Sequence, residues 1–226
     1  PVVLRRGRRG GFAAAGYCQY VSQTEKRYSC VVEPRWNGER WVATVAMPSW
    51  CAFLDDDSGN VAAGFLLEDD DRGHAPDASV TPAQVEALDR VATFEAELFA
   101  TVFAALRRYY DRVRPKYVEF ASRYPDFMGD VGASMSSDPD AATFARLHRF
   151  QGIFVHPTVW NGIAYVGFSF SATWEPEHGV GVMVHDRRVV EVGNADTAFT
   201  SWIAEGAKHA SSSAPGEPPD RDASTE

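Results

Sequence analysis

Alternating apolar and polar residues near the start of the chain predict a β-hairpin. Two β-rich runs, YSCVVE at 28–33 and RWVATVAM at 40–47, flank the dipeptide Asn37-Gly38. Asn-Gly is typical of tight hairpin turns, because both residues tolerate the positive φ that such turns require. A further strand is predicted over 61–68, where the run VAAGFLLE lies between two acidic segments.

A long amphipathic helix is predicted over residues 81–114. It begins with TPAQ at 81–84, in which Thr and Gln have the spacing of a capping box and Pro occupies the first helical position. From there apolar residues recur every three or four positions, as on the buried face of a helix. Pro115 is expected to end this helix, 116–137 to be irregular, and 138–149 to hold a short helix.

Turn signals after residue 152 predict an antiparallel β-meander. Strands are expected at 153–159 and 163–174, joined by a second Asn-Gly turn. Two more strands follow the proline-containing turn 175–179, and Asp186-Arg187 joins them. Asp196 is expected to cap a final helix.

The predicted fold class is therefore α+β. An antiparallel sheet, built from the N-terminal hairpin and the C-terminal meander, is expected to pack against one long helix and shorter helices.

Strand periodicity assigns a core face to the meander. The predicted core face of the strand at 163–174 comprises Val166, Phe168, Phe170, Ala172 and Trp174. A five-residue turn at 175–179 places Ala172 opposite Val182 and Phe170 opposite Val184, whereas a four-residue turn would pair Ser171 with Val182. The five-residue turn is preferred, because it keeps apolar residues together.

The opposite face of the meander collects small and polar side chains. Its predicted members are Ser169, Ser171, Thr173, Met183, His185 and Arg188. They form a candidate binding surface for a ligand or a protein, and plain solvent exposure is the alternative reading.

A carboxylate is predicted on the core face. With a two-residue turn at Asp186-Arg187, the register places Glu191 opposite Val182. Burying a carboxylate without a partner costs several kcal/mol, so Glu191 is a candidate buried acid. The alternatives are that Glu191 lies at the frayed end of the sheet or pairs with an arginine.

The turn WEPEHG at 174–179 is where chemistry is expected, if the chain has any. Glu175, Glu177 and His178 are residue types that bind divalent metals and act as general acids or bases, and Trp174 precedes them. No nucleophile elbow precedes the turn, and no catalytic residue, metal ligand or cofactor is assigned. A structural turn with Gly179 at positive φ, and a recognition loop, are the other interpretations.

Net charge restricts the class of partner. The chain carries 22 Lys and Arg against 31 Asp and Glu, a net charge of −9. Four of the arginines lie in the first ten residues, which leaves 18 basic against 31 acidic residues in the rest of the chain. An acidic body argues against binding nucleic acid and permits a basic protein partner, although solubility alone also explains it.

Composition divides the chain into a central domain and two tails. We expect a disordered basic arm at 1–25, a single α+β domain at 26–208 and a disordered tail at 209–226, which has no large apolar residue after its first positions. No apolar run is long enough to span a membrane. Three widely spaced cysteines fit neither a disulfide framework nor a zinc site, so the expected compartment is the cytoplasm.

The meander and the start of the long helix resemble a known family. The segment from Trp160 to Phe199, with TPAQVEALDRVATFE upstream, is similar to an uncharacterised bacterial domain of unknown function. That family's pattern has a TPEQ-type helix start, a C-T-W-D-x-E-H-G-L-G-V turn and an R-V-V-E-V-G-x-A-D ending. The resemblance covers about 31–199, and it implies a cytoplasmic bacterial protein with no established activity.

This chain departs from that pattern at three positions. Ala172 stands where the pattern has cysteine, Glu175 where it has aspartate and Asn194 where it has glycine. The loss of the cysteine argues against a thiol nucleophile or thiolate ligand, and the longer glutamate fits strict metal geometry poorly.

Two functional hypotheses follow. The first is a non-enzymatic, immunity-like protein-binding module, by analogy with small acidic proteins that neutralise basic bacterial toxins. The second is a metal-assisted hydrolase that uses Glu175, Glu177, His178 and Glu191 around the WEPEHG turn.

Overall fold

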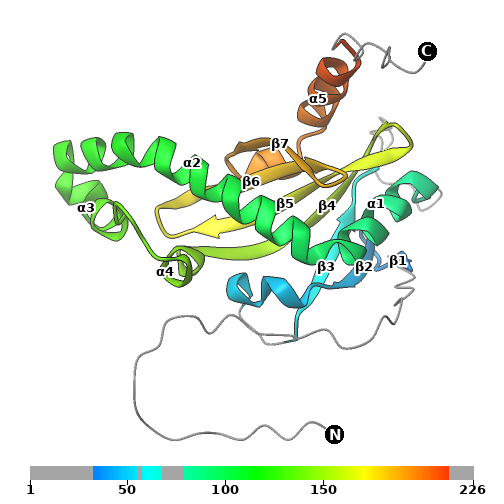
Figure 1. Cartoon of the computed structure of the whole chain (residues 1–226), viewed down its shortest axis with the longest axis horizontal. Helices are drawn as coiled ribbons and strands as arrows, with labels where there is room; N and C mark the ends of the chain where they lie inside the picture. The colour runs from blue at the N-terminus through cyan, green and yellow to red at the C-terminus, as the bar shows by residue number, and fades with distance from the viewer. Residues whose placement is uncertain (1–32, 55–57, 68–78, 214–226) are drawn as a thin grey trace, which may run out of the picture.

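In the part of the chain that the structure describes, seven strands form one sheet, in the same order as in the sequence from β1 to β7. The computed structural model describes residues 33–54, 58–67 and 79–213 (Figure 1). The strands are β1 (Arg35–Trp36), β2 (Trp41–Ala46), β3 (Asn60–Phe65), β4 (His148–Trp160), β5 (Ile163–Ala172), β6 (Glu175–His185) and β7 (Arg188–Gly193). The helices are η1 (Pro48–Phe53), α1 (Pro82–Thr93), α2 (Glu95–Arg123), α3 (Pro125–Ser134), α4 (Ala141–Arg146), η2 (Ala195–Ala198) and α5 (Ser201–Ser213).

The α+β prediction is confirmed, and the sheet contains one parallel pair of neighbouring strands. All neighbouring strands are antiparallel except β3 and β4, where Ala63 pairs with Ile153 and Phe65 with Val155. The chain passes through α1, α2, α3 and α4 between these two strands, and such a long crossover is what parallel neighbours require.

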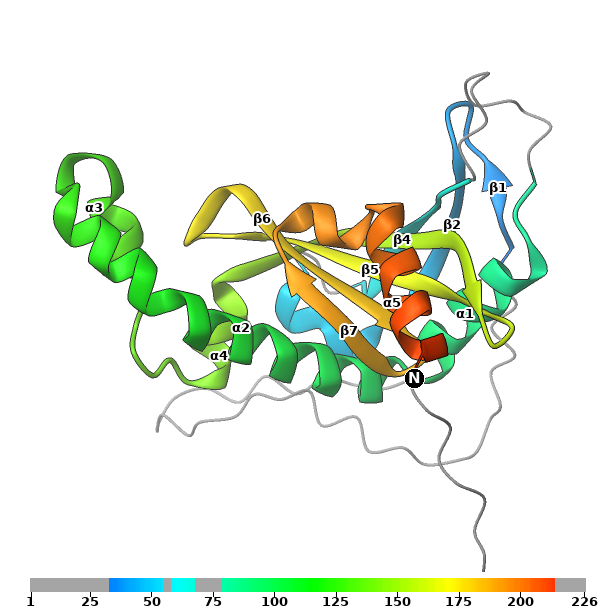
Figure 2. The ribbon, with the colours of Figure 1, turned by 90° about the horizontal axis from the view of Figure 1, so that it is seen from above.

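The sheet separates two apolar clusters of unequal size. The larger contains Phe168, Phe170 and Val182 of the sheet, together with residues of η1, α1, α2 and α4. The smaller, on the opposite face, contains Tyr165, Met183 and residues of α5. Figure 2 shows α2 running along the length of the sheet and α5 lying over the other side (Figure 2). The prediction that Phe168 and Phe170 face the core is confirmed.

The predicted long helix is divided at Phe94 and does not end at Pro115. The capping box is present, because the Thr81 side chain accepts from the Gln84 amide and the Gln84 side chain accepts from the Thr81 amide. Pro115 lies inside α2, where both it and Asp111, four residues earlier, are exposed. The proline ring therefore has room, and the carbonyl that loses its helical hydrogen bond remains open to water. The prediction of an irregular segment at 116–137 is wrong.

The turn of the first predicted hairpin is confirmed. Asn37 and Gly38 lie in its turn, and Trp36 pairs with Trp41 across it. Most of the run at 28–33 lies outside the described residues, as does the predicted arm at 1–25. At the other end of the chain, α5 continues past the predicted boundary at 209 to Ser213.

The register between β5 and β6 differs from the prediction by four residues of β6, which are two residue pairs on the same face. Phe170 lies opposite Val180 and Phe168 opposite Val182, because the chain turns at Thr173 and Trp174 and β6 already begins at Glu175. The predicted five-residue loop is wrong. A shift of an even number of residues, here four, preserves side-chain parity, so the predicted core face is still correct.

The prediction that Glu191 is buried is also wrong. The turn at Asp186-Arg187 pairs His185 with Arg188, as predicted. An irregularity follows on β7, however, so that Glu191 lies opposite Met183 instead of Val182. A β-bulge of one residue reverses the face of every later side chain, and the carboxylate of Glu191 is exposed.

The last part of the chain forms a short 3-10 helix before α5. The predicted helix cap at Asp196 is wrong, because Asp196 lies within η2 and α5 begins at Ser201. Among the described residues, no helix combines the length and the apolar character that a membrane span requires.

Candidate functional site

A large aromatic residue anchors the tight turn between β5 and β6. Trp174 is 1% exposed. Its indole ring packs edge-on against Tyr110, Tyr117 and His148. Within the described part of the chain, its buried indole N–H has no acceptor. This packing fixes the position from which β6 starts and holds Glu175 beside α2.

Glu175 and His178 form a pair at the start of β6. Nδ1 of His178 lies 3.0 Å from Oε1 of Glu175, whose side chain is 17% exposed. The hydrogen bond to Glu175 and the charge of that carboxylate raise the pKa of His178 above its usual range. Gly179 follows with φ +59°, which confirms the predicted positive φ. A side chain there would lie 2.5 Å from the Phe170 carbonyl oxygen, so the position requires glycine.

A groove opens between this turn and the helical hairpin that α2 and α3 form. Its volume is about 610 Å³. It is lined by Lys116, Tyr117, Phe120, Met128 and Val131 of the two helices and by residues 174–178. We call it the hairpin groove. Close contact of the helices shapes it, because a Cβ at Gly132 of α3 would lie 2.6 Å from the Cβ of Ala121.

The hairpin groove has apolar side chains that water reaches. Phe120 is 45% exposed, and the neighbouring Tyr124 is 47% exposed with its ring 4.7 Å from that of Phe120. These aromatic residues lie near the end of α2, at the projecting end of the molecule (Figures 1 and 2). Exposed aromatic pairs at the edge of a groove are typical of surfaces that bind a partner.

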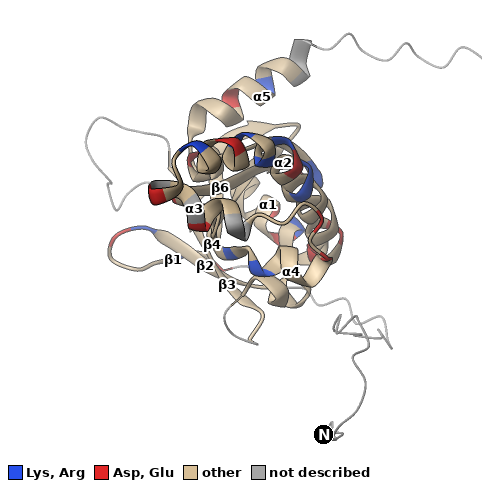
Figure 3. Ribbon diagram, turned by 90° about the vertical axis from the view of Figure 1, so that its left-hand side faces the viewer, with Lys and Arg blue, Asp and Glu red and all other residues tan. Residues whose placement is uncertain are grey.

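Acidic side chains outnumber basic ones at this end of the molecule. Figure 3 views the molecule from the α3 end, with its charged residues coloured (Figure 3). The carboxylates here are Glu119, Asp126, Asp130, Glu175 and Glu177. The cations are Lys116, Arg123 and Arg114, whose Nε donates to the carbonyl of Met135 just after α3. Arg123 already pairs with Glu119 at 3.1 Å. The rim of the hairpin groove is therefore acidic, in agreement with the charge of the whole chain.

The predicted polar patch on the other face of the meander does not exist as one surface. Ser169 and His185 are each 7% exposed, and Met183 is fully buried. Gly167 and Gly181 leave the sheet flat, so η2 lies directly on it, with the Asn194 carbonyl 2.6 Å from where a Cβ of Gly181 would be. These two glycines allow η2 to cover the face that we interpreted as open.

Three predicted members of the patch are exposed, but they lie apart. Ser171 accepts a hydrogen bond from the side chain of Gln151 at 3.2 Å. Thr173 lies in the turn, where its amide donates to the Leu147 carbonyl at 2.9 Å. Arg188 begins β7 at the far end of the meander. No ligand site follows from their positions.

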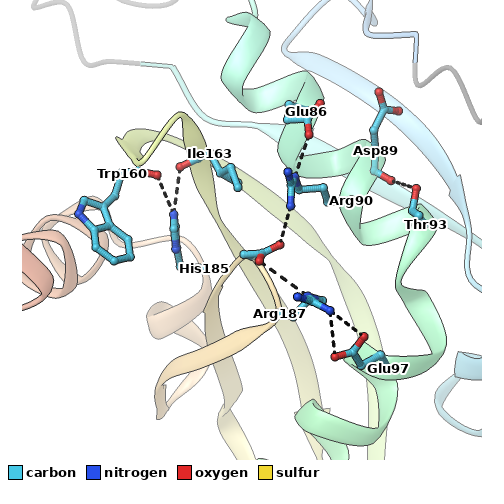
Figure 4. Close-up of polar contacts among 10 residues, drawn as sticks. Glu86, Asp89, Arg90, Thr93, Glu97, Trp160, Ile163, His185 and Arg187 are labelled. Atoms are coloured by element: carbon cyan, nitrogen blue, oxygen red, sulfur yellow. Dashed lines mark hydrogen bonds and ion pairs between the residues drawn. The ribbon is translucent and has the colours of Figure 1, made fainter. Parts of the chain in front are cut away.

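His185 and the turn after it have structural roles (Figure 4). Nε2 of His185 lies 2.9 Å from the Trp160 carbonyl and 3.2 Å from the Ile163 carbonyl, so this nitrogen donates to the β4–β5 turn. In the next turn, Asp186 accepts from Arg90 of α1 at 3.2 Å. Arg187 pairs with Glu97 of α2 at 3.3 Å. These contacts hold the β6–β7 turn against α1 and α2.

The structure brings four of the predicted site residues together, Trp174, Glu175, Glu177 and His178. Sequence reasoning missed the α2 and α3 residues opposite them, because we expected α2 to end at Pro115. One signal was available, since Tyr117, Phe120 and Ala121 continue the helical spacing beyond the proline. Across the described residues, no three His, Cys, Asp or Glu side chains lie close enough to share a metal ion.

Comparison with known proteins places the chain in a family. No curated protein and no solved structure matches it. A family model described as a domain of unknown function, DUF6985, matches residues 32–199, from just before β1 to just after η2. The expectation of membership in an uncharacterised family is thus confirmed, and this chain belongs to the DUF6985 family.

Proposed function

We propose that this protein is a non-enzymatic protein-binding module, immunity-like and acting in the bacterial cytoplasm, that holds a basic partner in the hairpin groove. The observation that carries the proposal is the combination of an apolar floor with an acidic rim in one groove of about 610 Å³. The expected partner presents an aromatic or aliphatic anchor next to lysine or arginine.

The apolar floor supplies a reason for affinity. Tyr117 and Val131 are half-buried in the free protein, and Phe120 is 45% exposed. Covering such side chains removes apolar area from water, and a fully buried Phe contributes roughly 1.5–3 kcal/mol. If a partner inserted an anchor residue between α2 and β6, burial of that residue and burial of Phe120 would both contribute to the binding free energy.

The acidic rim supplies a reason for selectivity. Glu177 is exposed, and Glu175 is held in place by His178 at 3.0 Å. An acidic rim attracts a basic partner at long range and raises the rate of association, with a strong dependence on salt. The carboxylates of α3 extend the same field beyond the groove.

The hydrolase hypothesis has less support. Glu191 belongs to β7 and is exposed in a different groove, so it does not join Glu175 and His178. Among the described residues, no third His, Cys, Asp or Glu lies close enough to Glu175 and His178 to complete a metal site. We therefore favour binding over catalysis at this site.

The test begins with capture of the partner. The tagged full chain is incubated with lysate of its source organism at low and at high salt, and the retained proteins are identified by mass spectrometry. The captured protein is then purified and its association rate with the wild-type chain is measured. We expect a basic protein in near-stoichiometric amount that high salt releases.

The variant Glu175→Lys/Glu177→Lys then locates the interface. It should lower the association rate with that protein by about tenfold or more and weaken its salt dependence. The matched control, Glu39→Lys/Glu205→Lys, makes the same change in net charge at two exposed positions outside the hairpin groove. If both double variants bind the partner equally well, the hairpin groove is not the interface.

A further inference from the structure

A second groove runs along the edge of the sheet. β7 is the last strand in the sheet order, so β6 is the one described strand that pairs with it. Among the described residues, no backbone or side-chain group outside β6 hydrogen bonds to the backbone of β7. Half of its backbone N–H and C=O groups therefore point outward, with no partner among residues 33–54, 58–67 and 79–213. Such an edge is a template for one more strand.

Helix α2 forms the other wall of this groove. The groove has a volume of about 430 Å³ and is lined by residues 189–192 of β7 and by Ala105, Arg108, Tyr109 and Arg112 of α2. β7 is the edge strand of the sheet, and its four consecutive lining residues lie beside α2. The groove therefore follows the backbone edge of β7. We call it the β7 groove.

The helix wall carries two available positive charges. Arg108 and Arg112 are exposed, and within the described part of the chain neither pairs with a carboxylate. Arg112 lies over the ring of Tyr109, 5.1 Å from its centroid. Glu191 is the carboxylate of the groove lining, and Arg188 stands at the start of the strand. The groove and its end are thus net positive, unlike the rim of the hairpin groove.

The spacing of these arginines matches an extended peptide. Residues four apart on a helix are separated by about 6 Å along its axis. Side chains two apart on one face of a strand are separated by about 6.6–6.8 Å. A strand that pairs with β7 would thus present two carboxylates at the interval of Arg108 and Arg112, and guanidinium groups bind carboxylates with two parallel hydrogen bonds.

We propose that the β7 groove binds an extended acidic peptide segment of a partner protein, which adds to the sheet beside β7 and places carboxylates two residues apart against Arg108 and Arg112. Backbone hydrogen bonds to β7 provide affinity, and the two arginines select acidic side chains. This site is separate from the hairpin groove and does not depend on the function proposed for that groove.

A second copy of this chain fits the β7 groove less well. Pairing of two β7 strands about a two-fold axis would bring Arg108, Arg112 and Arg188 of both copies to one interface, and like charges there oppose association. An acidic strand would hydrogen bond to the backbone edge of β7, and its charge is opposite to that of the arginines.

The probe for the test is the peptide acetyl-TVEVEVT-amide, titrated into the full chain by calorimetry. Two matched peptides separate the contribution of the acidic side chains from that of the backbone hydrogen bonds. In acetyl-TVKVKVT-amide the charges are reversed, and in the third peptide N-methylation of alternate residues removes the N–H groups of one edge while keeping the acidic side chains. Hydrogen exchange read by mass spectrometry locates the bound peptide. We expect the acidic peptide to protect β7 and to bind at least tenfold more tightly than either matched peptide.

Variants of the protein complete the test. Arg108→Glu/Arg112→Glu should lower affinity for the acidic peptide at least tenfold, whereas Arg35→Glu/Arg146→Glu makes the same charge change at exposed sites elsewhere and should leave it unchanged. Equal binding of the N-methylated or the lysine peptide, protection at 174–178 in place of β7, or no binding up to about 1 mM would overturn the proposal. Protection of β7 by concentration-dependent self-association without peptide would overturn it as well.

Discussion

Gly167 controls how closely η2 approaches the sheet. A Cβ at this position would overlap the carbonyl group of Ala198, and η2 has no flexible side chain there that could move aside. We therefore predict that Gly167→Ala displaces η2 and lowers the free energy of unfolding by about 1–3 kcal/mol, as overpacked sites do. Urea denaturation followed by tryptophan fluorescence measures the change.

The matched control is Gly206→Ala in α5. Gly206 is exposed and a Cβ there meets no atom within 4 Å. The same added methyl group should raise the free energy of unfolding by about 0.5–1 kcal/mol, because alanine favours the helix. An unchanged or higher stability of the Gly167 variant would mean that η2 is not held against the sheet in solution.

His148 should make the protein sensitive to acid. It is 4% exposed and packs among the rings of Phe53, Phe144 and Trp174. One ring nitrogen, Nδ1, lies 3.0 Å from the Phe144 carbonyl, so this nitrogen carries the proton and Nε2 does not. Burial lowers the pKa of His148 from 6.5 to about 4.

The sign of the effect follows from which state binds the proton. Between pH 6.5 and about pH 4 the unfolded chain protonates this histidine and the folded chain does not, so stability falls as pH falls through that window. From pH 7.5 to pH 5 the loss should be about 2 kcal/mol. Burial lowers the pKa of His156 too, and adds a loss in the same direction.

The variant His148→Gln isolates this contribution. It keeps a side-chain donor for the Phe144 carbonyl but does not titrate. Urea denaturation at pH 7.5 and pH 5 should therefore show a smaller loss of stability for the variant than for the wild type. Parallel losses in the two proteins would show that His148 does not remain neutral in the folded state.

At the scale of whole elements, Pro115 is the least expected feature. Its missing N–H leaves one helical hydrogen bond of α2 unmade, yet the helix continues to Arg123 and carries one wall of the hairpin groove. We predict that Pro115→Ala stabilises the protein by about 1–3 kcal/mol, because it restores that bond. Thermal unfolding followed by circular dichroism measures the change.

Pro125→Ala is the control for that prediction. Pro125 occupies the first turn of α3, where its N–H would have no helical partner, so its removal gains no hydrogen bond. Both substitutions raise the entropy of the unfolded chain alike, and only the difference between them reports on α2. Equal effects of the two variants would contradict the assignment of a continuous helix through Pro115.

Local signals predicted most elements, and the errors have local causes. The capping box at Thr81 and the turn at Asn161-Gly162 were found, since each depends on a few neighbouring residues; in the structure these two turn residues have φ of +49° and +79°. The register of β6 and the bulge on β7 were missed, because both depend on contacts with distant segments. The four-residue slip of β6 leaves the apolar pattern intact, so patterning alone does not detect it.

The candidate site shows the same limit. The residues of the WEPEHG turn were recognised from their chemistry, but the opposite wall of the hairpin groove comes from helices more than forty residues earlier in the chain. The polar patch around Ser169 was misread, because alternation along a strand identifies a face and does not say what covers it. In this fold η2 covers it, and only the tertiary structure shows this.

At the scale of the whole molecule, the two apolar clusters imply two levels of stability. The larger joins the sheet to η1, α1, α2 and α4, whereas the smaller is Tyr165, Met183 and Ala204 with their neighbours. The family match ends at residue 199, before α5 begins at Ser201. We infer that α5 is a separate unit that docks on a sheet already stable without it, and that it opens at a lower free energy than the sheet.

Ala204→Glu tests this inference. Ala204 is fully buried against the sheet, and a carboxylate there is costly enough to undock α5. The free energy of unfolding should fall by about 1–3 kcal/mol and no more, because α5 can undock instead of burying the charge. Hydrogen exchange should show loss of protection in α5 while β4 and β5 stay protected. Trp202→Glu is the control, since Trp202 is 70% exposed and the same charge there should leave α5 docked. Simultaneous loss of protection in α5 and the central strands would instead show that helix and sheet unfold as one cooperative unit.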